Sequence, residues 1–263
     1  MEYRSFAENF AKQAGEIIQK NFRLGMDKEW KEDNTPVTAT DIEINDLLLD
    51  SVAKEFPGHN VLAEEKSRLG KDSEFVWVCD PVDGTIPFSA GIPICTFSLA
   101  LVKNGESILG VVADPLGDRF FIAEKGQGAF LNGAKIRVST VSDLRGQTAN
   151  CDTFETAYYD SYKLSGYLRM VKGVKLLTLC SFVYSAVLAA AGELAFSIFP
   201  HTTAHDAAAV KIIVEEAGGK VTDLFGNEQR YDKPINGALV SNGFLHGKLT
   251  DLIKKMVFKN MNF

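Results

Sequence analysis

The stretch that decides the fold is Trp77-Val78-Cys79-Asp80-Pro81-Val82-Asp83-Gly84-Thr85. Its apolar first half is typical of a buried strand, which we expect to end at Asp80. Pro81 has no backbone N–H and a fixed φ angle, so it predicts a turn at that point. Gly84 allows the backbone to pass close to whatever lies above it, and Thr85 can begin a short helix. The stretch therefore predicts a strand that delivers polar side chains to a sheet edge beside a helix start.

Asp80 and Asp83 give this edge a particular chemistry. Two carboxylates would lie beside a helix N-terminus, which by its own dipole favours anions. The combination is consistent if divalent cations bind the carboxylates and bridge them to a phosphate. Asp-Pro and Asp-Gly are also common turn dipeptides, so the stretch taken alone fits an ordinary loop equally well.

Four other acidic residues favour the metal interpretation when they are taken together. Glu64-Glu65 follows a predicted strand at residues 60–62, Asp41 lies at the start of a predicted helix, and Asp206 is expected to open another. Each alone has a simpler explanation, because paired glutamates usually face water and aspartates often cap helices. The case for a shared site rests on the whole set.

Apolar periodicity predicts two helices on a sheet in the first half of the chain. The helices cover residues 6–22 and 40–56, and the polar segment 28–34 between them predicts an exposed loop. Short apolar runs predict strands at residues 60–62, 75–79, 94–102, 107–112, 120–124 and 129–131, with a hairpin at Asn104-Gly105. We therefore expect residues 1–141 to form an N-terminal α+β half, with two helices on a largely antiparallel sheet.

Helices and strands alternate in the second half. Helices are expected at residues 161–171, 181–191, 206–217 and 244–258. Strands are expected at residues 174–177, 194–199, 220–223 and 238–241. Residues 142–263 are thus predicted to form a C-terminal α/β half that supplies Asp206, and the fold class of the whole chain is α/β with layered α+β elements.

Composition excludes several classes of protein. The 263 residues carry 28 Lys and Arg against 34 Asp and Glu, a formal net charge of −6, which lacks the basic character expected of a nucleic-acid binder. The four cysteines form no Cys-x-x-Cys pair of the zinc or redox type. The sequence contains no apolar run of membrane-spanning length and no signal-peptide pattern at its N-terminus. We expect a cytoplasmic protein that binds neither nucleic acid nor membrane.

Four motifs in order resemble the inositol monophosphatase family. They are Val37-Thr38-Ala39-Thr40-Asp41, Ala63-Glu64-Glu65, Asp80-Pro81-Val82-Asp83-Gly84-Thr85 and Asp206-Ala207-Ala208-Ala209 followed by Glu216-Ala217-Gly218-Gly219. The resemblance runs from about residue 2 to residue 252. It implies an αβαβα sandwich, as in the lithium-sensitive, magnesium-dependent phosphatase superfamily that includes fructose-1,6-bisphosphatase, and it implies a homodimer.

The resemblance also implies roles for individual residues. The metal ligands for two to three Mg²⁺ ions, with Mn²⁺ also possible, would be Glu64, Asp80, the backbone carbonyl of Val82, Asp83 and Asp206. Contacts to substrate and phosphate would come from Asp83, Gly84, Thr85 and Asp206. Glu64, Thr85 and Asp41 would position the attacking water. Lys31 is similar to a mobile-loop lysine near the metals of the family.

The activity implied is Mg²⁺-dependent hydrolysis of a small phosphorylated polyol or sugar by metal-activated water. Two departures bear on the substrate. His205 stands where the family usually has Trp, and it could contact substrate or simply pack. Phe199 stands where inositol-specific members carry an acidic residue that hydrogen-bonds sugar hydroxyls. Histidinol phosphate and fructose 1,6-bisphosphate are therefore alternative substrates, and a catalytically idle, protein-binding relative is the alternative of another class.

Overall fold

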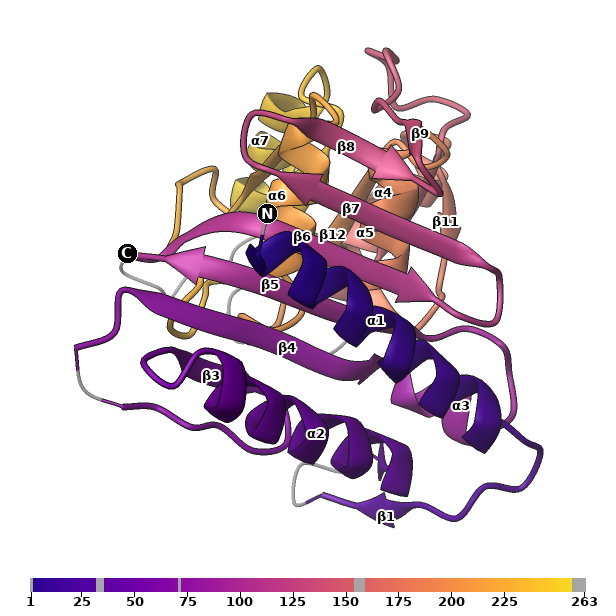
Figure 1. Cartoon of the computed structure of the whole chain (residues 1–263). Helices are drawn as coiled ribbons and strands as arrows, with labels where there is room; N and C mark the ends of the chain where they lie inside the picture. Colours follow the sequence, from indigo (N-terminus) through magenta and orange to yellow (C-terminus); the bar gives the residue numbers. More distant parts are fainter. Residues whose placement is uncertain (1, 32–35, 71, 154–158, 257–263) are drawn as a thin grey trace.

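In the computed structural model, two large β-sheets alternate with three layers of helices (Figure 1). It describes residues 2–31, 36–70, 72–153 and 159–256. Three hydrophobic clusters hold the layers together: one outside the first sheet, one between the sheets and one outside the second sheet. This is the αβαβα sandwich expected from the resemblance. Within the described residues, no helix combines the length and the apolar character needed to cross a membrane.

The first sheet has seven strands in the order β3-β4-β5-β6-β7-β8-β9. Their bounds are Asn60–Ala63, Phe75–Asp83, Thr96–Lys103, Glu106–Asp114, Arg119–Glu124, Gly128–Leu131 and Ala134–Lys135. Only the β3–β4 pair is parallel; every other neighbouring pair in this sheet is antiparallel. The largely antiparallel sheet expected from the hairpin signals is therefore present.

Alternating side chains of β4 bind the sheet to helices on both of its faces. Trp77 and Cys79 pack into the cluster formed with α1 (Glu2–Asn21) and α2 (Ala39–Glu55). Val76 and Val78 point to the opposite face, toward α5 (Phe182–Ala190) and α6 (Ala208–Glu216). A strand buried on both faces explains why this run is apolar at nearly every position.

The second sheet has five strands in the order β11-β10-β12-β14-β13. In that order their bounds are Lys175–Leu177, Thr148–Cys151, Phe196–Phe199, Ala238–Ser241 and Lys220–Thr222. α4 (Ser161–Met170) and α7 (His246–Met256) cover its outer face. The sequence did not predict β10, because four residues with little alternation give no strand signal. The last residues of the expected helix at 244–258 lie outside the described part of the chain.

Two expectations for the first half of the chain were wrong in detail. β4 does not end at Asp80 but continues through Pro81 to Asp83, with a bulge that places Asp80 opposite Ser98 and Asp83 opposite Thr96. A bulge interrupts the ladder, so it accepts a residue that has no N–H to donate. The described part of segment 28–34 is also not simply a loop, because β1 (Glu29–Trp30) pairs antiparallel with β2 (Pro36–Val37).

Candidate active site

Three aspartates from the two halves of the chain meet at one cavity of about 480 Å³. Asp80, Asp83 and Asp206 each offer a carboxylate oxygen, and these oxygens all lie within 4.8 Å of one another. Asp80 and Asp83 flank the bulge of β4, whereas Asp206 lies in the turn before α6. The sequence predicted that Asp206 opens this helix, and that prediction was wrong. α6 begins at Ala208, with Ala207 as its cap.

The bulge in β4 sets the directions of the first two carboxylates. The N–H of Val82 donates to Asp80 Oδ1 at 3.0 Å instead of to a neighbouring strand. The Asp83 carboxylate accepts hydrogen bonds from the Ser181 and Thr96 hydroxyls and from the N–H of Phe182. Asp83 is therefore held by β5 and by the first residues of α5 together.

Burial makes these three carboxylates unfavourable without a compensating positive charge. Burial and repulsion from Glu64 and Asp206 raise the pKa of Asp80 well above its ordinary value. Burial and repulsion from Asp206 also raise the pKa of Asp83, although Ser181 and Thr96 act against this. Burial raises the pKa of Asp206 despite the nearby His205. A cluster of oxygen donors with this electrostatic strain could hold a divalent cation, and oxygen donors suit Mg²⁺.

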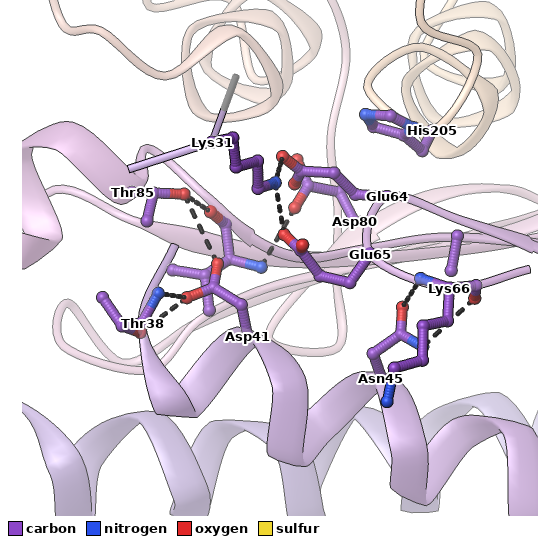
Figure 2. A network of polar contacts seen from close by, with 12 residues as sticks. Lys31, Thr38, Asp41, Asn45, Glu64, Glu65, Lys66, Asp80, Thr85 and His205 are labelled. Carbon is purple, nitrogen blue, oxygen red and sulfur yellow. Dashed lines mark hydrogen bonds and ion pairs between the residues drawn. The ribbon is translucent and has the colours of Figure 1, made fainter. Parts of the chain in front are cut away.

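Glu64 and Glu65 follow β3 and lie next to Lys31 (Figure 2). The Lys31 ammonium contacts Glu64 Oε1 at 2.7 Å and Glu65 Oε1 at 2.5 Å. Burial alone would lower the pKa of Lys31, but the two carboxylates raise it above its ordinary value. Glu64 lines the same cavity as the aspartates but does not belong to their cluster. Its negative charge is balanced by Lys31.

Asp41 and Thr85 lie side by side on the other flank of the site (Figure 2). The Thr85 hydroxyl lies 2.9 Å from the carbonyl oxygen of Val82 and 3.4 Å from Asp41 Oδ1. Asp41 Oδ2 accepts from the Thr38 N–H, as part of the capping box of α2, and also from the Thr38 hydroxyl. Burial raises the pKa of Asp41 to about 6, although the Thr38 hydrogen bonds lower it. Asp41 thus caps the start of α2 with Oδ2, and its Oδ1 faces the Thr85 hydroxyl.

Gly84 caps the short helix α3 (Thr85–Ser89) in a left-handed conformation with φ of 86°. A Cβ atom at this position would lie 2.9 Å from the carbonyl oxygen of Ile94 and 3.1 Å from Ser181 Cβ. Both the backbone angle and the surrounding space therefore require glycine. Gly84 and Thr85 line the cavity, and the first N–H groups of a helix have no partner within the helix.

The sequence missed several residues that line the cavity. Asp152 lies directly after β10 with 4% of its surface exposed, and burial raises its pKa to about 6. Ser181 and His201 were not singled out either. The only sequence signal for Asp152 would have been an acidic residue at a strand end, which requires β10 to be recognised first. Asp152 comes close to Asp206 only through the tertiary structure, because the two residues are far apart in sequence.

The protein family model described as "Inositol monophosphatase family" matches residues 1–258. The chain belongs to the inositol monophosphatase family. A "fructose-1,6-bisphosphatase/inositol-1-monophosphatase" of Thermotoga maritima is 35% identical over 226 residues, which cover 84% of this chain and 83% of the relative. The "Nus factor SuhB" of Escherichia coli is 32% identical over 270 residues, which cover 95% of this chain and 98% of the relative.

Solved structures of inositol monophosphatases share the fold. The Thermotoga maritima IMPase superposes with a TM-score of 0.86 at 30% sequence identity, covering 97% of this chain and 98% of that one. Members of the inositol monophosphatase family are metal-dependent phosphatases that bind phosphate esters, which agrees with the buried acidic cluster of this chain. His205, which departs from the family pattern, lies half-buried at the cavity with Nε2 3.6 Å from Asp206 Oδ2.

Proposed function

We propose that the chain is a Mg²⁺-dependent phosphomonoesterase that hydrolyses small phosphorylated alcohols. The observation that carries the proposal is the convergence of Asp80, Asp83 and Asp206 within 4.8 Å at the edge of the cavity. Such a group of buried carboxylates is electrostatically costly, and a divalent cation is the partner that would offset the cost. Membership of a family of phosphatases supports the reaction class.

The donors available fit magnesium. Glu64, Asp80, Asp83, Asp206 and the backbone carbonyl of Val82 would hold two to three Mg²⁺ ions, with Mn²⁺ as the alternative. All of these donors are oxygens, which suit hard cations and disfavour zinc. Bound Mg²⁺ would lower the pKa of a coordinated water and offset charge on the leaving oxygen. Glu64 would exchange its contact with Lys31 for a contact with the cation.

The residues around the cluster would position the reactants. The Thr85 hydroxyl can donate to Asp41, which leaves its oxygen as an acceptor for the attacking water. Glu64 lies on the same cavity and would help to orient that water. The backbone N–H groups of Gly84 and Thr85, at the start of α3, would bind the phosphate oxygens. Catalysis would then come mainly from positioning and charge stabilisation, with direct transfer to water.

A phosphorylated polyol or sugar is the general substrate class, with histidinol phosphate and fructose 1,6-bisphosphate as alternatives. Phe199 argues against specificity for inositol, because it offers no acceptor for sugar hydroxyls at that position. The second candidate function is protein binding without catalysis. It is favoured by the similarity to relatives named "Nus factor SuhB" and opposed by the complete set of costly carboxylates.

A phosphate-release screen separates these functions. Purified protein would be incubated with myo-inositol 1-phosphate, histidinol phosphate, fructose 1,6-bisphosphate and 4-nitrophenyl phosphate, with millimolar Mg²⁺ or with EDTA. Mg²⁺-dependent release from at least one ester is the expected result. The absence of release from every ester, by protein that binds Mg²⁺ in calorimetry, would overturn the enzyme and favour the protein-binding function.

A further inference from the structure

Asp152 directly follows β10, the strand that pairs with the strand of Phe199. β10 and β12 pair in parallel, and the N–H of Asp152 donates to the carbonyl of Ile198 at 3.2 Å. Asp152 and Phe199 both line the cavity. Position 199 carries no carboxylate, but Asp152, at the end of the neighbouring strand β10, brings one to the same cavity.

Aromatic rings form the wall beside this carboxylate. Phe182 and Phe199 stack with their ring centroids 4.4 Å apart and an interplanar angle of 24°. The imidazole of His201 lies 5.0 Å from the Phe199 ring, and all three residues line the cavity. Phe199 is thus fixed between two rings and only 6% exposed, so it contributes a packed apolar wall to the cavity in place of a hydrogen-bond acceptor.

The basic side chains that line the cavity with Asp152 are two histidines, His201 and His205, and burial lowers the pKa of His201. Among the described residues that line the cavity there is no lysine or arginine, and Lys31 lies outside that lining, on Glu64 and Glu65. Asp152 does not belong to the group of three aspartates that could share a cation. Asn150 Nδ2 donates to Asp152 Oδ1 at 3.2 Å, which is a neutral hydrogen bond. A buried carboxylate in this position would be stabilised by a positive charge on the ligand.

We propose that Asp152 and the ring of Phe199 form a leaving-group subsite that selects phosphomonoesters whose alcohol carries a protonated amine. The ammonium would pair with the Asp152 carboxylate beside the apolar wall, which would shield the ion pair from water. A neutral polyol would gain only hydrogen bonds. A second phosphate on the alcohol would be repelled by Asp152, which disfavours sugar bisphosphates. The proposal rests on the phosphatase function above and narrows its substrate class.

The test compares two esters of the same alcohol, one with a protonated amine and one in which acetylation has removed that charge. L-Histidinol phosphate carries a protonated amine, and its N-acetyl derivative does not. We expect the wild-type holoenzyme at pH 7.5 to prefer the free amine at least tenfold in kcat/KM. Asp152→Asn should remove that preference, mainly by raising KM for the free amine, so that kcat/KM should fall at least tenfold more for L-histidinol phosphate than for its N-acetyl derivative. Asp143→Asn, a change of an exposed carboxyl to its amide, is the matched control and should keep the preference.

Three results would overturn the subsite. One is an equal kcat/KM of the wild type for the two esters. Another is an equal loss for all esters in Asp152→Asn, which indicates a structural role. The third is a higher Mg²⁺ requirement in this variant with the preference retained, which makes Asp152 a metal ligand. If no ester is hydrolysed, the phosphatase function fails separately, and calorimetric binding of the two esters in Ca²⁺ tests the subsite, because equal affinities would contradict it.

Discussion

The backbone N–H of Phe182 donates a hydrogen bond to Asp83 Oδ1 at 3.2 Å, across 99 positions of sequence. Asp83 belongs to the first sheet, and Phe182 begins α5, which packs between the two sheets together with α6. The Ser181 hydroxyl, just before that helix, donates to the other oxygen of the same carboxylate. The orientation of a proposed metal ligand therefore depends on the packing of both halves of the chain.

Replacing Asp83 by Asn should nearly abolish turnover. The amide removes one negative charge and one oxygen donor from the group of three aspartates. We expect kcat to fall by at least about 100-fold, in line with the size of effects from single electrostatic groups in active sites. Phosphate release at saturating ester, followed over a range of Mg²⁺ concentrations, measures the loss.

Asp46→Asn is the matched control for this substitution, because Asp46 is a surface carboxylate that pairs with Lys66. It should keep wild-type kcat and Mg²⁺ dependence. Near-normal turnover of Asp83→Asn at an unchanged Mg²⁺ requirement would contradict the assignment of Asp83 as a ligand.

The parts of the fold that local sequence patterns determine could be predicted. Apolar residues at helical spacing indicated α1 and α2, and Asn104-Gly105 indicated the β5–β6 hairpin, because these signals operate between neighbours in sequence. The acidic motifs indicated that Asp80, Asp83 and Asp206 would converge, and their oxygens do. The motifs sufficed because each places a carboxylate at the end of a regular element or at a bulge.

Features that depend on distant partners could not be predicted. Pro81 suggested the end of a strand, yet the pairing of β4 with β5 carries the strand through it by means of a bulge. Asp152 gave no signal, because its place at the cavity follows from the parallel pairing of β10 with β12. Ser181 likewise reaches Asp83 only after α5 packs between the sheets. These relationships are set by tertiary packing, and the periodicity of a single sequence carries no information about contacts between distant residues.

Gly84→Ala should destabilise the protein more than a comparable substitution in open space. Alanine at φ of 86° is strained, and its Cβ would lie 2.9 Å from the carbonyl oxygen of Ile94. Gly146 has φ of 76° and no heavy atom within 4 Å of the place that an alanine Cβ would take, so Gly146→Ala isolates the backbone cost. We expect a loss of about 1 kcal/mol for Gly146→Ala and roughly 3 kcal/mol for Gly84→Ala in urea unfolding. Equal losses would mean that the contact with Ile94 relaxes without cost.

Asp152→Asn should change how the stability of the metal-free protein depends on pH. Burial raises the pKa of Asp152 to about 6 in the folded protein, above the ordinary value of about 4 in the unfolded chain. The folded state therefore holds this proton more tightly, so the stabilisation is fully present below pH 4 and is lost as pH rises through 6. The amide cannot ionise, so the variant should gain roughly 2 kcal/mol relative to the wild type between pH 4 and pH 7.

Urea unfolding in EDTA at several pH values measures this difference. Asp143→Asn again serves as the control, since that carboxyl is fully exposed. A free-energy difference between Asp152→Asn and the wild type that stays constant from pH 4 to pH 7 would show that Asp152 binds its proton equally tightly in the folded and unfolded chains.

His246 should give a pH dependence of the opposite sign. Its ring is buried, with Nε2 2.8 Å from Thr222 Oγ1 and Nδ1 2.8 Å from Ser241 Oγ. Burial, assisted by Lys220, lowers the pKa of His246 to about 4, below the ordinary value of about 6.5 in the unfolded chain. The unfolded chain therefore takes up a proton first as pH falls, so stability present above pH 6.5 is lost between pH 6.5 and pH 4. Solvent screening limits the loss to roughly 2 kcal/mol.

His246→Gln keeps a polar side chain at this position without the titration. It should be less stable than the wild type at pH 7.5, because one amide cannot reproduce both ring contacts with Thr222 and Ser241. Its deficit should shrink as pH falls toward 4, because only the wild type loses the histidine contribution. Asp41 and Asp152 titrate in the same range with the opposite sign, so the informative quantity is the difference between variant and wild type in urea unfolding. A deficit that does not change from pH 7.5 to pH 4.5 would mean that His246 is protonated equally in the folded and unfolded chains.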